Sequence, residues 1–207
     1  MIVSIIIPTL NRCDQLNRTL LSLINLKTPS NLFEIIIVDN GSTDSTAFIV
    51  KKYQDENSNI DIRYFYDSNP GLLTGRHLGA KESKFDILTF IDDDVHVSST
   101  WLDTIIEVME NKKDIVFLTG PNLPLYESYP PVWLSYFWSE KYNLKKMGWL
   151  SLLDLGNNVI EISPDNVWGL RKNKFEELGG FNPDCITNQY KQFQGNSESV
   201  LTQKGIH

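Results

Sequence analysis

The stretch Phe85–Val97, Phe-Asp-Ile-Leu-Thr-Phe-Ile-Asp-Asp-Asp-Val-His-Val, joins an apolar run to an acidic one. Its apolar run, residues 87–91, is rich in β-branched and aromatic residues, which predicts a buried parallel strand. Three consecutive carboxylates, Asp92, Asp93 and Asp94, follow that run. They would repel one another strongly if nothing neutralised them. Because open α/β sheets bind ligands beyond the carboxyl ends of their strands, these acids mark a candidate site.

Two interpretations of the three acids stay open at this point. The alternate acids Asp92 and Asp94 can approach one hard cation, and a divalent ion held by one or two carboxylates keeps room for substrate phosphates. That interpretation predicts a metal–diphosphate site. The other interpretation is an acidic loop that caps the next helix, and these residues alone do not choose between the two.

The segments on either side alternate between strand and helix patterns. This alternation predicts a parallel sheet covered by helices on both faces. Polar residues follow three strands, near Pro8, Asp39 and Asp92, so one nucleotide could touch all three strand ends. The expected strands are residues 2–7, 33–38, 62–66, 87–91 and 115–118, and the expected helices are residues 16–24, 47–53, 72–84 and the segment after Thr100.

Two of these helices carry possible capping residues. Asn11 precedes the first helix and could cap it. Thr100 with Asp103 matches the spacing of a capping box.

Length and composition restrict the function classes. A chain of 207 residues is long enough for one good-sized domain and short for two. The net charge of −7 argues against a nucleic-acid-binding protein, which needs a basic face. Cys13 and Cys185 lie far apart without metal-ligand spacing, which favours free thiols in a reducing compartment. The sequence predicts no signal peptide and no membrane-spanning segment.

The composition changes after Pro121. Aromatic residues are dense over residues 126–149, which suits sugar stacking, a partner surface or a membrane-edge patch, with a second small core as the alternative. Residues 159–163 and 167–170 have strand patterns, and residues 172–178 form a short expected helix that ends at Gly179-Gly180.

Five segments, in this order along the chain, resemble the family-two glycosyltransferases, which have a GT-A fold. The resemblance implies a single α/β domain with a mostly parallel, Rossmann-like sheet flanked by helices and a smaller acceptor-side sheet. Residues 1–120 would be the nucleotide-sugar-binding half and residues 121–207 the acceptor-binding half. The segments are residues 4–12, residues 38–44, Asn69-x-Gly71 with Arg76 and Gly79, residues 90–94, and residues 166–171 followed by 178–182.

The resemblance assigns nucleotide contacts to the first three segments. Asp39 would accept hydrogen bonds from the base, with Thr9 and Arg12 beside it. Arg76 would face the nucleotide or its phosphates. For Asp39, a turn or N-cap role remains the alternative, and for Arg76 an exposed helical position.

The resemblance also gives the three acids separate roles. Asp92 and Asp93 would hold the ribose and the surroundings of the metal. Asp94 would be the main metal ligand, with Asp92 beside it. The ion would be Mn²⁺ or Mg²⁺, because an all-carboxylate ligand set suits either, and it would neutralise charge on the leaving diphosphate.

The acceptor hydroxyl needs a base, which the family supplies from an acidic pair after its Gly-Gly-Phe block. The matching stretch here is residues 195–201. Glu198 falls at the base position, and Ser197 replaces the first acid. The alternative for Glu198 is a solvated glutamate, with Asp184 as the fallback base.

The implied activity is metal-dependent, inverting transfer of a sugar from a nucleotide-diphospho sugar, preferably a UDP-sugar. The acceptor would be a saccharide or a lipid-linked molecule in surface polysaccharide synthesis, and the enzyme would be cytoplasmic, in peripheral contact with the inner membrane face. A non-catalytic nucleotide- or sugar-binding module is one alternative. A sugar-phosphate nucleotidyltransferase is another, although the glycine- and basic-rich loop that it needs is missing after the first strand. No G-x-G-x-x-G follows that strand, which argues against a dehydrogenase.

Two departures from the family pattern stand out. His77 lies where the family often has asparagine, and it receives no role because a lone helical histidine is usually packed or solvated; His96 also receives none. The family pattern continues beyond residues 204–207 with a further strand and a metal-ligand histidine, so we expect that the chain is truncated there.

Overall fold

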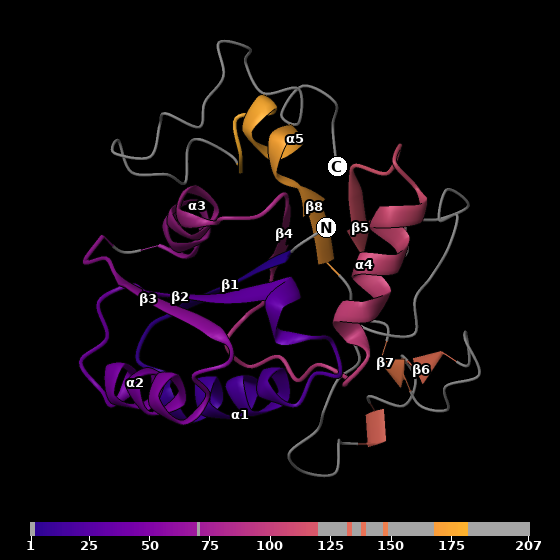
Figure 1. Ribbon diagram of the computed structural model, residues 1–207. Helices are drawn as coiled ribbons and strands as arrows, with labels where there is room; N and C mark the ends of the chain where they lie inside the picture. The colour runs from indigo at the N-terminus through magenta and orange to yellow at the C-terminus, as the bar shows by residue number, and fades with distance from the viewer. Residues whose placement is uncertain are drawn as a thin grey trace. The chain divides into compact units, whose positions relative to one another are not determined.

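The computed structural model describes residues 3–69, 71–119, 132–133, 138–139, 147–148 and 168–181 (Figure 1). The chain divides into two compact units, residues 1–118 with 168–207, and residues 119–167. In the second unit, β6 (Trp138–Ser139) pairs antiparallel with β7 (Met147–Gly148). The expected halves, residues 1–120 and 121–207, stay a prediction. Within the described part of the chain, no helix is long and apolar enough to cross a bilayer.

Strands and helices alternate along the first unit, as the sequence predicts. The expected strand at residues 167–170 is present, and the one at residues 159–163 lies outside the described residues. The elements are β1 (Val3–Thr9), α1 (Cys13–Ile24), the 3-10 turn Ser30–Leu32, β2 (Phe33–Asp39), α2 (Thr46–Glu56), β3 (Asp61–Tyr66), α3 (Leu72–Glu82), β4 (Ile87–Phe90), α4 (Trp101–Asn111), β5 (Phe117–Thr119), β8 (Trp168–Arg171) and α5 (Lys172–Glu177).

The strands form a six-stranded sheet in the order β3-β2-β1-β4-β8-β5. β1 pairs in parallel with β2 and β4, and β2 pairs in parallel with β3, while β8 runs antiparallel to β4. This mixed α/β arrangement confirms the expected fold class. Because Thr9 pairs with Asp39 in the register, the carboxyl ends of these neighbouring strands lie at the same edge of the sheet.

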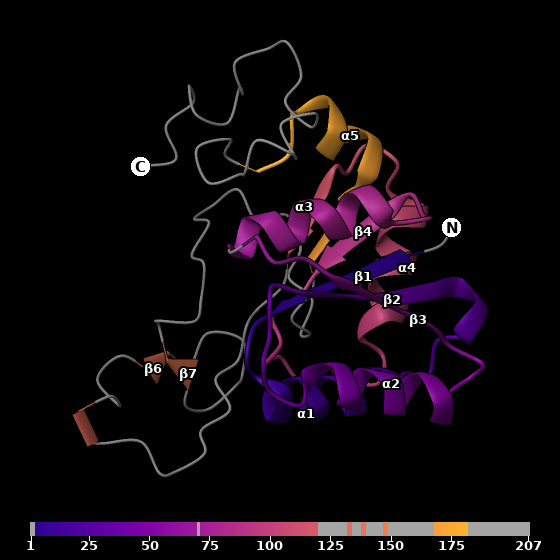
Figure 2. The ribbon, with the colours of Figure 1, turned by 90° about the vertical axis from the view of Figure 1, so that its left-hand side faces the viewer.

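Helices cover both faces of the central strands. α1 and α2 lie against one face and α3 against the other (Figure 2). Every residue of β1 and β2 is therefore buried, which explains why both strands are apolar runs rather than alternating patterns. The core lies along these strands and under the amphipathic helices α1 and α4.

The capping prediction for Asn11 is wrong, and the one for Thr100 is right in position but not in its hydrogen bonds. Arg12, rather than Asn11, is the N-cap residue of α1, and Asn11 has a left-handed backbone with φ of 54°. The side chain of Asn11 instead accepts a hydrogen bond from the backbone of Thr43. At α4, Thr100 is the N-cap residue, but its side chain makes no capping hydrogen bond, and the Asp103 carboxylate accepts a hydrogen bond from the Thr28 hydroxyl. In both places the side chain expected to cap the helix, or to complete the capping box, bonds instead to a residue distant in the sequence.

His77 is fully buried on α3, which confirms that it is a packed side chain. Its ring packs against Phe175 and Phe181, and its Nε2 accepts a hydrogen bond from the backbone N–H of Phe181. A Cβ atom at Gly180 would lie 2.2 Å from the imidazole ring, so the Gly-Gly-Phe turn after α5 can close on α3 only with glycine at that position. Burial lowers the pKa of His77 to about 4, so the imidazole is neutral at pH 7.

Candidate functional site

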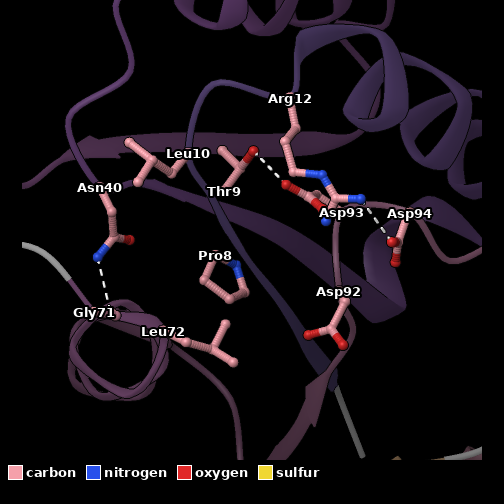
Figure 3. A pocket seen from close by; sticks show the side chains of 10 residues that line it. All are labelled: Pro8, Thr9, Leu10, Arg12, Asn40, Gly71, Leu72, Asp92, Asp93 and Asp94. Carbon is pink, nitrogen blue, oxygen red and sulfur yellow. Dashed lines mark hydrogen bonds and ion pairs between the residues drawn. The ribbon is translucent and has the colours of Figure 1, made fainter.

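A cavity of about 380 Å³ lies where β1, β2 and β4 end (Figure 3). It has the size of a small-molecule site. All three candidate acids at the end of β4 line it, together with two of the residues expected to contact a nucleotide. The lining residues are Pro8, Thr9, Leu10, Arg12, Asn40, Gly71, Leu72, Asp92, Asp93 and Asp94.

The loop that carries Arg12 is held by the neighbouring loop after β2. The backbone N–H of Asn11 donates to the Ser42 hydroxyl at 2.8 Å, and the side chain of Asn11 accepts from the backbone of Thr43 at 2.8 Å. One residue beyond Arg12, the N–H of Cys13 donates to the Asp44 carboxylate at 3.0 Å. These contacts fix the start of α1 and so place Arg12 over the end of β4.

Asp93 is the buried member of the three acids. Its side chain accepts a hydrogen bond from the Thr9 hydroxyl at 2.7 Å and forms an ion pair with Arg12 at 2.9 Å. Its backbone carbonyl accepts from the hydroxyl of Thr19 on α1. Burial raises the pKa of Asp93, although the Thr9 hydrogen bond and the Arg12 charge both oppose that shift. Asp93 therefore joins the ends of β1 and β4.

Asp92 and Asp94 are open to solvent, each with 51% of its side chain exposed. Asp92 pairs with Arg76 at 2.7 Å, and Asp94 pairs with Arg12 at 2.8 Å. The hydrogen bond to Asp94, and after it the charge of Asp93, raise the pKa of Arg12. Two guanidinium groups thus neutralise most of the repulsion among the three acids.

Asp92 and Asp94 fit a divalent ion that also takes ligands from a substrate. Both side chains line the cavity, both are half exposed, and both offer hard carboxylate oxygens, which suit Mg²⁺ or Mn²⁺. Among the residues that the structure describes, no group of three His, Cys, Asp or Glu side chains could hold a metal. A cation held by these two carboxylates keeps room for phosphate oxygens or water. That Asp94 is the main ligand stays a prediction.

Asp39 is not among the residues that line the cavity. It is 1% exposed, and its carboxylate accepts from the backbone of Ser42 at 2.7 Å and from the Tyr64 hydroxyl at 2.6 Å. The Ser42 contact belongs to the turn interpretation of this residue, and base recognition by Asp39 stays a prediction. Burial, and then the hydrogen bond to Asp39, raise the pKa of Tyr64.

Arg76 lies just outside the cavity lining. Its side chain is 16% exposed and pairs with Asp92, and its guanidinium carbon lies 5.8 Å from the ring centre of Phe181. Arg76 therefore links the open acid of the site to the turn after α5. A contact with nucleotide phosphates stays a prediction for this residue.

Asn40 and Tyr64 were not among the predicted site residues. Asn40 donates from its side chain to the carbonyls of Asn69 and Gly71, at 3.2 and 2.9 Å, and so holds the turn before α3 against the cavity (Figure 3). Its position in a cluster of turn residues was an available signal. The sequence holds no such signal for Tyr64, because an aromatic residue inside a strand is usually interpreted as part of the core.

Glu198, the predicted base, and the fallback Asp184 lie outside the described residues, and so does most of the aromatic stretch at residues 126–149. Trp133 is described and is exposed. His96 is exposed and lies outside the cavity lining.

Comparison with known proteins gives a family match. The family described as "Glycosyl transferase family 2" matches residues 4–179. Chondroitin synthase from Pasteurella multocida is 36% identical over 121 residues, which are 58% of this chain and 12% of that protein. The chain spans between 12% and 40% of the length of the first curated relatives that it matches.

Solved structures share the fold at low sequence identity. TarS residues 1–349 from S. aureus, in complex with UDP, has a TM-score of 0.66 at 19% identity, over 93% of this chain and 53% of that one. The mannosyltransferase PcManGT from Pyrobaculum calidifontis, in complex with GDP-Man and Mn²⁺, has a TM-score of 0.53 at 16% identity, over 57% of this chain and 34% of that one. These likenesses confirm the GT-A fold.

Proposed function

The chain belongs to glycosyl transferase family 2, and from that premise we propose that its cavity binds the nucleotide diphosphate of a sugar donor. The observation that carries the proposal is the position of Asp92 and Asp94. Both lie half exposed at the carboxyl end of β4, in a cavity that Thr9 and Arg12 close from the end of β1. This is the edge of an open α/β sheet where ligands bind.

The donor we propose is a UDP-sugar. TarS, which shares the fold, has been solved with UDP, whereas PcManGT has been solved with GDP-Man. In this chain Asp39 would accept hydrogen bonds from the base, after a local change that opens its carboxylate to the cavity. Thr9 and Arg12 would lie beside the nucleotide, and Asp92 and Asp93 would hold the ribose.

The reaction we propose is a single in-line displacement at the anomeric carbon, with inversion. Glu198 would take the proton of the acceptor hydroxyl as it attacks. Arg12 and Arg76, which pair with Asp93 and Asp92, would put positive charge beside the diphosphate, where negative charge grows as the bond to the sugar breaks. A divalent cation held by Asp94 and Asp92 would neutralise further charge there. Positioning and charge stabilisation are the two contributions asked of the chain.

The acceptor we propose is a saccharide or a lipid-linked saccharide of a surface polysaccharide. The likeness to a chondroitin synthase supports a polysaccharide product. A cytoplasmic enzyme in peripheral contact with the inner membrane face would meet both the soluble donor and such an acceptor.

Calorimetric titration of UDP, with and without Mn²⁺, tests the donor site. Wild type should bind UDP more tightly when Mn²⁺ is present, and Asp94→Asn should lose that gain. Asp55→Asn is the matched control, because it also neutralises an exposed aspartate in an ion pair, with Lys51, but outside the cavity. UDP binding that needs no metal and survives Asp94→Asn would contradict the metal–diphosphate site.

A second experiment separates transfer from binding. Glu198→Gln should keep UDP binding and abolish sugar transfer, because the amide cannot accept the acceptor proton. If wild type binds donors tightly but neither transfers nor hydrolyses any of them, the chain is a binding module instead.

A further inference from the structure

Building on the proposed donor site, we propose that Arg12 is an internal counter-ion that couples cation binding to diphosphate binding. In the structure Arg12 holds Asp94. When cation and diphosphate arrive together, Arg12 exchanges Asp94 for the diphosphate. Three features give this role to Arg12: it contacts both Asp93 and Asp94, its side chain is partly exposed, and its backbone is held at the start of α1.

The first argument is the geometry of the guanidinium group. Its Nη1 lies 2.9 Å from Oδ1 of Asp93 and its Nη2 lies 2.8 Å from Oδ2 of Asp94. One planar fork therefore bridges two neighbouring carboxylates, which a lysine ammonium, as a single point charge, would do less well. Figure 3 shows the guanidinium group next to Asp94, where its hydrogen bond engages one of the carboxylate oxygens that a cation would use.

The second argument is the asymmetry between the two contacts. Asp93 is 5% exposed and also bonded to Thr9, so its position is fixed. Asp94 is 51% exposed and Arg12 is 43% exposed, so solvent and ligands can compete for the contact between them. Arg12 can therefore release Asp94 and stay in the cavity through its contact with Asp93.

The third argument is the charge of the site. Three carboxylates and two arginines, Arg12 and Arg76, give a net charge of −1. A divalent cation alone would make that charge +1 and would also cost the contact between Arg12 and Asp94. A diphosphate restores the balance and gives the displaced guanidinium a new partner. Cation and nucleotide should therefore each strengthen the binding of the other, because coupling between two ligands is reciprocal.

Arg76 does not share this role. It lies outside the cavity lining, only 16% of its side chain is exposed, and Phe181 lies against its guanidinium group. Arg12, in contrast, extends from the N-cap position of α1 into the cavity. The proposal is thus specific to one of the two arginines.

The experiment measures Mn²⁺ binding to the full chain by electron paramagnetic resonance of free Mn²⁺, with and without UDP. Without UDP, Arg12→Gln should bind Mn²⁺ at least about fivefold more tightly than wild type, because its competitor is gone. The strengthening of Mn²⁺ binding by UDP should be at least about fivefold smaller in Arg12→Gln than in wild type. Arg18→Gln is the matched control, since it removes the same charge from an exposed position on α1 outside the cavity.

Each other outcome decides against the proposal. Equal Mn²⁺ affinity in wild type and Arg12→Gln without UDP, while wild type still binds UDP with Mn²⁺, overturns the counter-ion role and leaves the donor site standing. An equal gain in Arg18→Gln means that overall charge is the cause, and it overturns the role as well. If wild type binds no UDP under any condition, the proposed function fails, and the counter-ion role fails with it.

Discussion

The two ends of strands β1 and β2 carry the same kinds of side chain in different settings. At the amino end, Ser4 of β1 donates to Glu34 of β2 at 2.7 Å, and Arg63 pairs with Glu34 at 3.0 Å. The backbone N–H of Lys84 donates to the same carboxylate, which is fully buried. We call Ser4, Glu34 and Arg63 the amino-end cluster. Its carboxylate has partners on both oxygens, all from the protein itself.

At the carboxyl end, a hydroxyl, carboxylates and an arginine meet again as Thr9, Asp93, Asp94 and Arg12. Here only part of the group is closed. Asp93 is buried with two partners, whereas Asp92 and Asp94 are each half exposed and each pair with one arginine. Residue type therefore does not separate a structural cluster from a ligand site. What separates them is whether the charged oxygens are all used inside the protein or stay accessible.

The largest effect on stability should come from breaking the closed cluster. Glu34→Gln takes away the nearer charge partner of the partly buried Arg63 and leaves it only Glu82, at 3.9 Å, which should lower the free energy of unfolding by about 3 kcal/mol. UDP binding should stay within about twofold of wild type, because Glu34 lies at the other end of the strands from the cavity. Urea unfolding and calorimetry measure the two quantities. A loss below about 1 kcal/mol would mean that burial does not give the amino-end cluster a large contribution to the free energy of unfolding.

His77 gives a second test of burial, through pH. Its pKa is lowered to about 4 in the folded protein, so between pH 6.5 and pH 4 the unfolded chain binds more protons. The free energy of unfolding should therefore fall as the pH drops through that window. Above pH 6.5, His77 should make no contribution to the pH dependence. We expect a loss of about 2 kcal/mol between pH 8 and pH 5 from this residue, and His77→Asn should lack that share. Equal pH dependence of urea unfolding in both proteins would contradict the buried neutral histidine.

Asp92 is a solvent-exposed acid, so in contrast to Glu34 its substitution should weaken UDP binding and leave stability nearly unchanged. Asp92→Asn should change the free energy of unfolding by less than about 1 kcal/mol, since the exposed pair with Arg76 is screened and the repulsion from its neighbours is relieved. UDP binding in the presence of Mn²⁺ should weaken about tenfold, because a ligand-facing carboxylate is lost. Calorimetry and urea unfolding on one preparation measure both. A large loss of stability with unchanged UDP binding would place Asp92 with the closed cluster.

The sequence predicted the fold, and with it the meeting of three polar strand ends at one edge of the sheet, because both depend on local patterns. Short apolar runs such as residues 33–38 are typical of strands covered on both faces, and parallel strands bring Thr9, Asp39 and Asp92 to one edge. What it missed depends on contacts between distant residues. The role of Asn11 between two loops, and the bond from Tyr64 to Asp39, have no local pattern that could reveal them. The pairing of Arg12 with Asp94 also joins residues 82 positions apart.

The smallest effect on stability should come from an exposed ion pair at the amino end of the strands. This pair tests whether the position of a charged group or its accessibility to solvent sets its contribution to stability. Lys84 pairs through its side chain with Asp61 at 2.7 Å, and both side chains are about half exposed. The backbone of the same residue serves the buried Glu34, and a side-chain substitution leaves that bond in place. Lys84→Ala should therefore lower the free energy of unfolding by less than about 0.5 kcal/mol, and less still at high salt. A loss as large as that of Glu34→Gln would show that the amino end of the sheet matters as a whole, and accessibility would no longer explain the difference between the two ends.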